Sequence, residues 1–180
     1  MAVNIIFHCS DSSFGNAALI SKWHTLPSQK VIQNGKTFFG RGWNYIGYHY
    51  VILNGWLSKD IRHTFFDGHI ETGRPLNEDP FIEKDEKGAH VFGHNDNSVG
   101  VCLIGKSGKF TDKQLFSCLK VICLFEKQFE DIKIWQHSDF DQNKPYCAGL
   151  DIEKLKLDYE GFRGVCQSQT DDNLAEFIKM

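Results

Sequence analysis

The chain has 180 residues, of which 41% are hydrophobic and 13% aromatic, so it can bury one good core but is too short for two ordinary domains. Its formal charge of -3 and its pI near 6.2 provide no broad basic surface for nucleic acid phosphates, and we expect no nucleic-acid partner. No apolar run approaches the length needed to span a bilayer, so we expect no membrane insertion.

The opening residues, MAVNIIFHCSDSS, lack a positively charged start and a long apolar stretch with a cleavage site, and no secretory signal is visible in them. The six cysteines are scattered without the dense spacing of a disulfide framework, although an even number permits bridges. We therefore expect a chain that is made and folded in a reducing cytoplasm.

The first two elements are predicted from their apolar patterns. Residues 3–7, VNIIF, form a nearly continuous apolar run rich in β-branched side chains, which is typical of a strand buried on both faces. This run ends at His8. After a polar stretch, apolar residues recur at helical spacing and predict a helix over 18–26.

The middle of the chain predicts further strands and a long loop. Residues 45–53, YIGYHYVIL, predict a second strand, and Asn54-Gly55 predicts a turn directly after it. Residues 63–75, HTFFDGHIETGRP, predict a hairpin. Residues 77–97 carry many charged and turn-forming side chains, and we expect a surface loop there, an element that often carries function.

The most clearly marked helix follows a buried-strand run at residues 98–105, SVGVCLIG. Thr111 with Gln114 three residues later forms a capping box, which predicts that a helix begins there. Its apolar face is predicted to consist of Leu115, Leu119, Ile122 and Phe129.

The last core strand is predicted at residues 132–135, and His137 comes just beyond it. A closing helix is expected from Asp151 onward, with one domain over 1–157 and a C-terminal extension over 158–180 that is polar near its end. Strands that alternate with helices indicate a single α/β domain, with a mixed central β-sheet flanked by α-helices.

Three residues in this pattern suit a metal ion. His8 and His137 each follow a buried strand, and Cys147 lies ten residues after His137. Ligand-binding residues collect beyond the carboxyl ends of strands in such sheets, so the two histidines can meet in space. Two imidazoles and a thiolate suit zinc, and three protein ligands leave the fourth position for water, whose pKa zinc lowers to about 7.

Spacing alone leaves ordinary alternatives open for all three residues. A lone histidine after a strand is usually a hydrogen-bonded surface or core residue, and a lone cysteine is usually a small buried apolar group. No close CxxC pair or HExxH motif supports the metal site.

A set of ordered motifs points further. FHCS, GWNYIGYHYVI, DGHIETGR, GAH, NDNSVGVCLIG and the late histidine-loop-cysteine together resemble the type-2 N-acetylmuramoyl-L-alanine amidases, which include short phage lysozymes and peptidoglycan recognition proteins. The resemblance runs in order from about residue 3 to residue 155. It implies the peptidoglycan-recognition-protein-like amidase fold and an enzyme that hydrolyses the amide between N-acetylmuramic acid and the L-alanine of the stem peptide.

The resemblance also implies roles for individual residues. One zinc ion would be held by His8, His137 and Cys147, and keeping Cys147 favours an enzyme, because family members without this cysteine tend to bind without cutting. Tyr48 matches the catalytic tyrosine of the family, and strand alternation lets only one of Tyr48 and His49 point into a given cleft.

Three further matches concern the rim of the cleft. Lys144 is expected to stabilise the oxyanion, although the family places its lysine two residues before the cysteine, where this chain has Pro145. His90, in GAH, is expected to touch substrate or assist proton transfer. Asn97 is expected to shape the same rim.

The setting implied is a phage or prophage endolysin, made in the host cytoplasm and acting as a monomer on bacterial peptidoglycan after release. One alternative is a non-catalytic peptidoglycan-binding or regulatory protein of the same fold. Another is a thiol hydrolase, with Cys147 or Cys9 as nucleophile and His137 or His8 as base.

Overall fold

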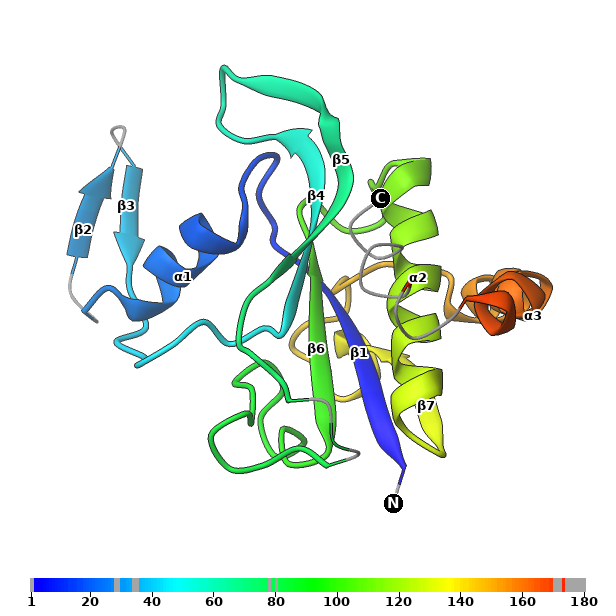
Figure 1. Ribbon diagram of the computed structural model, residues 1–180. Helices are drawn as coiled ribbons and strands as arrows, with labels where there is room; N and C mark the ends of the chain where they lie inside the picture. Colours follow the sequence, from blue (N-terminus) through cyan, green and yellow to red (C-terminus); the bar gives the residue numbers. More distant parts are fainter. Residues whose placement is uncertain are drawn as a thin grey trace.

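A five-stranded mixed sheet forms the centre of the molecule (Figure 1). The computed structural model describes residues 2–27, 30–33, 36–77, 79, 81–169 and 173. The strands, in the spatial order β5-β4-β6-β1-β7, are β1 (Val3–Cys9), β4 (Tyr50–Trp56), β5 (Arg62–Thr72), β6 (Ser98–Leu103) and β7 (Ile132–Gln136). β5 is antiparallel to β4 and the other neighbouring strands are parallel, so the predicted α/β class and mixed sheet are confirmed.

Helices cover both faces of this sheet (Figure 1). α1 (Ala17–Thr25) lies on one face, beside a separate antiparallel hairpin of β2 (Lys30–Gln33) and β3 (Lys36–Phe39). α2 (Asp112–Gln128) and α3 (Ile152–Ser168) lie on the other. In the part of the chain that the structure describes, no helix is long and apolar enough to cross a membrane.

The two faces of the sheet carry different cores. Strand side chains alternate, so Ile5 and Phe7 of β1 point into the larger core, which α2 and α3 cover. The smaller core on the α1 face is formed by a separate set of buried residues, which are Ile20, Ile46, Val51, Leu53, Cys102 and Ile104. His8 alternates with Phe7 and therefore presents its ring to the α1 face.

The capping box of α2 is confirmed, but the prediction that Leu115 lies on its buried apolar face is wrong. Thr111 Oγ1 accepts from the Gln114 backbone N–H, and Gln114 Oε1 accepts from the Thr111 N–H, each at 3.1 Å. Leu115 is 36% exposed. Gln114 turns inward beside it, because its amide donates to the carbonyls of Ile52 and Ile104 at 3.0 and 2.9 Å and so joins α2 to the sheet.

The predicted strand at 45–53 and the turn at Asn54-Gly55 are corrected by the structure. β4 begins only at Tyr50, because Gly47 is held outside the sheet by hydrogen bonds to the His24 ring and the Ala89 backbone. Asn54 and Gly55 lie inside β4, where the register against β5 shifts. Gly55 has φ +81°, a left-handed conformation that glycine adopts easily, so this dipeptide forms a bulge and not a turn.

The predicted hairpin at 63–75 is also wrong. Residues 62–72 form one long strand, β5, which pairs with β4 from Trp56 opposite Arg62 to Tyr50 opposite Thr72. The strands β4 and β5 themselves form a hairpin, whose turn lies at residues 57–61.

α3 is joined to α2 by a disulfide between Cys123 and Cys166, which the scattered cysteine spacing did not indicate. Both cysteines are fully buried, and Tyr159 of α3 is also buried against the larger core. The expected boundary between residues 157 and 158 falls inside α3. Most of the polar tail lies outside the described residues.

We expect the disulfide to stabilise the fold by restricting the unfolded chain. It closes a segment with a sequence separation of 43, so Cys166→Ala should lower the free energy of unfolding by about 2–4 kcal/mol in denaturant titrations. Reductant should then change the variant no further, whereas Cys118→Ala, which loses a buried free thiol, should still respond to reductant. Equal stability of Cys166→Ala and the unaltered protein would contradict this prediction.

Candidate metal centre

His8 forms the buried base of the candidate site. It lies within β1, not just beyond it as the sequence predicted, and its side chain is fully buried. Parallel pairing sets His8 beside Cys102 of β6 in the middle of the sheet. An imidazole in this position needs a partner for each ring nitrogen, because burying an unpaired polar group is costly.

His137 reaches His8 because β7 pairs with β1 in parallel, with Gln136 opposite Phe7. The chain then turns into a short 3-10 helix, η1 (His137–Asp139). The Nδ1 atoms of His8 and His137 are 3.2 Å apart. The sequence expectation that these two distant histidines meet in space therefore agrees with their placement.

Cys147 returns to the same point through a loop that is closed by backbone hydrogen bonds. The Ser138 N–H donates to the Cys147 carbonyl at 2.6 Å, and the Cys147 N–H donates to the Lys144 carbonyl at 3.0 Å. Cys147 Sγ lies 4.0 Å from His8 Nδ1 and accepts from the Cys9 backbone N–H at 3.4 Å.

The donor set fits one tetrahedral metal ion. One ligand atom from each of His8, His137 and Cys147 lies within 4.8 Å of the other two. Zinc holds nitrogen at about 2.0–2.1 Å and sulfur at about 2.3 Å, which puts tetrahedral donors roughly 3.3–3.7 Å apart. The two spacings from His8 Nδ1, 3.2 Å to His137 Nδ1 and 4.0 Å to Cys147 Sγ, lie close to these values.

The protonation states of these side chains also bear on metal binding. Burial, with the neighbouring His90 and His137, holds the pKa of His8 well below its usual value. Burial also lowers the pKa of His137, so both rings are neutral and able to offer a lone pair. The hydrogen bond with Cys9, and then burial, raise the pKa of Cys147, and a metal ion would have to displace its proton.

Tyr48 lies over His8, with the two ring centroids 5.0 Å apart. It is not on a strand, so strand alternation does not explain its direction. Its carbonyl accepts from the Arg74 N–H at 2.8 Å, and its ring contacts that of His24, with centroids 5.4 Å apart. Burial raises the pKa of Tyr48 well above its usual value, so the phenol keeps its proton and stays a hydrogen-bond donor.

His90, which the resemblance suggested would touch substrate or assist proton transfer, lies behind His8. Its side chain is buried, and its Nδ1 lies 3.1 Å from His8 Nε2. Its Nε2 lies 3.3 Å from Ser98 Oγ. Both nitrogens are therefore occupied, and burial, with His49 next in effect, lowers the pKa of His90 to about 3.

Lys144 lies on the loop that leads to the metal cluster, whereas Asn97 lies away from the cluster. Lys144 is exposed on the loop before Cys147, and its charge helps to lower the pKa of His137. The structure does not bring Asn97 to the metal cluster. Asn97 pairs with Asn4 at the start of β1, four residues or roughly 13 Å before His8, and its amide donates to the Ala2 carbonyl.

The loop at 77–97 contains no helix or strand among its described residues, as predicted, and two buried polar residues anchor it. Glu86 accepts from the Glu83 N–H at 2.9 Å and from the Asn77 N–H. His49 Nε2 donates to the Glu86 carbonyl at 2.9 Å, while its Nδ1 accepts from the Gly100 N–H at 2.9 Å. Sequence analysis missed this anchor, because no local pattern pairs His49 with a loop 37 residues away.

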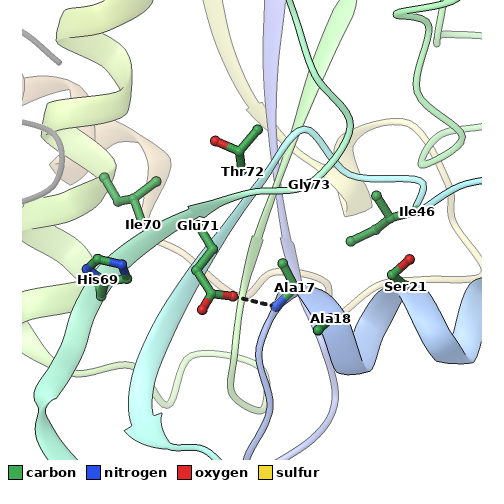
Figure 2. Close-up of a pocket in the computed structure, with 9 residues that line it drawn as sticks. All are labelled: Ala17, Ala18, Ser21, Ile46, His69, Ile70, Glu71, Thr72 and Gly73. Carbon is green, nitrogen blue, oxygen red and sulfur yellow. Dashed lines mark hydrogen bonds between the residues drawn. The ribbon is translucent and has the colours of Figure 1, made fainter.

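A cavity of about 620 Å³ lies between α1 and β5 (Figure 2). Ile46, Glu71 and Ser21 are among its lining residues, and the metal cluster is not. Glu71 is already engaged, because its carboxylate accepts from the Ala17 N–H at the start of α1 at 2.7 Å. Among the described residues, the histidine, cysteine and carboxylate side chains close enough to hold one metal ion are His8, His137 and Cys147, so this cluster is the stronger candidate site.

The chain is similar to phage endolysins, to amidases and to peptidoglycan recognition proteins. No protein-family model matches the sequence. The endolysin of Klebsiella phage KP32 is 26% identical over 121 residues, which are 63% of this chain and 66% of that protein, so slightly less than two thirds of the relative is spanned. The N-acetylmuramoyl-L-alanine amidase LysC from Clostridium intestinale is 20% identical with a TM-score of 0.63, covering 88% of this chain and 85% of LysC.

A third similarity is with Drosophila PGRP-LB, which is 24% identical with a TM-score of 0.56, covering 86% of this chain and 79% of that one. The chain therefore has the fold of these amidases and recognition proteins. The fold implied by the motif resemblance is confirmed.

We expect the three donors to bind one divalent transition-metal ion. After equilibration with zinc chloride and removal of free ion, elemental analysis should find about one ion per chain, and almost none in His8→Ala or Cys147→Ala. Cys118→Ala is the matched control, because this thiol lies in the larger core. Full metal content in Cys147→Ala would show that the cluster is not the binding site.

Proposed function

We propose that the chain is a zinc-dependent N-acetylmuramoyl-L-alanine amidase, which cuts the amide between N-acetylmuramic acid and the L-alanine of the peptidoglycan stem peptide. The observation that supports it most is the convergence of His8, His137 and Cys147, from three separate segments, on the fold shared with amidases. The similarity to phage endolysins supports a setting in which the enzyme acts on the cell wall after release, and we propose that it does so as a monomer.

His8 and His137 would hold the zinc ion through Nδ1, and Cys147 would hold it through Sγ. When bound, zinc polarises a carbonyl and lowers the pKa of a water molecule in its open fourth position to about 7. The chain supplies the fixed frame. His8 comes from a buried strand and Cys147 from a loop closed by its own backbone, so neither donor has to be ordered when substrate arrives.

Tyr48 would donate a hydrogen bond to the substrate carbonyl oxygen as negative charge develops there. The phenol keeps its proton because of its raised pKa, and contacts with His24 and His8 fix its ring. A donor that is already oriented stabilises the charge without reorganising, which is the usual source of such catalysis. Lys144 is exposed beside His137 and would add positive charge on a flexible stem.

Release of new amino termini from cell walls tests the proposal directly. Purified peptidoglycan incubated with the zinc-loaded protein should yield N-terminal L-alanine detectable by mass spectrometry. Cys147→Ala should yield none, and Cys118→Ala should match the unaltered protein. If the unaltered protein binds the walls and releases no L-alanine, the chain is a binding protein of the same fold and the amidase proposal fails.

Tyr48→Phe separates catalysis from metal binding. Loss of one oriented donor should lower kcat by about 100-fold or more while zinc content and KM change little. Tyr50→Phe is the matched control, because Tyr50 packs against Phe125 in the core on the opposite face. Unchanged kcat in Tyr48→Phe, or loss of its zinc, would show that the assigned role is wrong.

A further inference from the structure

The two nitrogens of the His8 ring face different partners. Nδ1 lies toward His137 and Cys147, and Nε2 lies 3.1 Å from His90 Nδ1. A neutral imidazole carries one hydrogen, and the nitrogen that lacks it is the one able to bind a metal. The direction of the hydrogen bond between His8 and His90 therefore decides whether Nδ1 is available.

That direction follows from Ser98. Its hydroxyl donates to the His94 carbonyl at 2.6 Å, and a carbonyl can only accept, so this bond uses the one hydroxyl hydrogen. The contact of 3.3 Å between Ser98 Oγ and His90 Nε2 is then a donation from the ring. A neutral His90 with its hydrogen on Nε2 has a bare Nδ1, which accepts from the Nε2–H of His8.

The His90 ring is held in place by its surroundings. Its backbone N–H and that of Val91 both donate to Asn95 Oδ1, at 2.9 and 3.0 Å. The ring packs directly on Gly100 of β6, where an added Cβ would lie 2.5 Å from its Cγ. It also touches Gly88, where an added Cβ would lie 2.7 Å from its Cδ2. Two glycines thus make room for this ring, one in β6 and one in the 77–97 loop.

We propose that His90, fixed by Ser98, is a positioning residue that holds His8 with its hydrogen on Nε2 and its Nδ1 bare and turned toward His137 and Cys147. The proposal deepens the zinc function and rests on it. Partners of this kind set the tautomer and orientation of a metal-binding histidine, and losing one typically weakens metal affinity 10–100-fold. It also removes His90 from direct contact with substrate.

Metal affinity in variants provides the first test. Zinc affinity, measured by competition with a chelator, should fall about 10–100-fold in His90→Phe, which keeps a ring of similar size without an acceptor. His90→Asn, whose amide oxygen can stand near the place of Nδ1, should recover most of the loss, and Ser98→Ala should lose less than His90→Phe. His69→Phe is the control, because His69 lines the cavity beside α1 and not the cluster.

The second test reads the tautomer without metal. In metal-free protein, ¹⁵N NMR of the imidazoles should show His8 protonated on Nε2, with a mixture of tautomers in Ser98→Ala and His90→Phe. This readout needs no variant to bind metal, so it stands even if the zinc function fails. Protonation of His8 on Nδ1 in the unaltered protein, or unchanged zinc affinity in His90→Phe, would overturn the proposal.

Discussion

His8 is fully buried in a central strand, and a buried imidazole must satisfy both ring nitrogens within the protein. One nitrogen is paired with His90, which belongs to the 77–97 loop. This pairing explains why the loop folds back over the sheet and why a glycine, Gly100, lies beneath the His90 ring. The other faces His137 and Cys147. The metal cluster and the 77–97 loop therefore each supply partners for one ring nitrogen of His8, whose position is set by β1.

The two faces of the sheet have different roles: one packs the larger core, and the other carries the candidate site. The larger core is mostly apolar, with the buried Gln114 amide bonded to strand carbonyls, and is closed by the Cys123–Cys166 bridge between α2 and α3. The α1 face carries the polar groups of the candidate site, among them His8, Tyr48 and His90. The polar groups are partnered on one face, and the opposite core supplies the burial that keeps the strands in register.

Local patterns in the sequence were enough to predict most of the elements, because burial of a strand or a helix face leaves a periodic signal. They failed at Asn54-Gly55, since the same dipeptide makes a turn or a bulge, and only the pairing of β4 with β5 decides between them. The meeting of His8 and His137 was predictable from their places after apolar runs. The placement of His90 was not, because it depends on Gly100 and Ser98 in a strand that the local sequence does not connect to it.

A thiol hydrolase remains the natural rival on these residues, and the contacts of the two cysteines weigh against it. A thiol nucleophile needs a lowered pKa and a base within hydrogen-bond reach. The hydrogen bond with Cys9 and burial raise the pKa of Cys147, and its contact of 4.0 Å with His8 Nδ1 is at the limit for a hydrogen bond to sulfur. The pKa of Cys9 is lowered to about 7, but by its hydrogen bond with Cys147 and not by an imidazole. A thiol mechanism would use one cysteine with one histidine as base, whereas a metal ion uses both rings and the sulfur together.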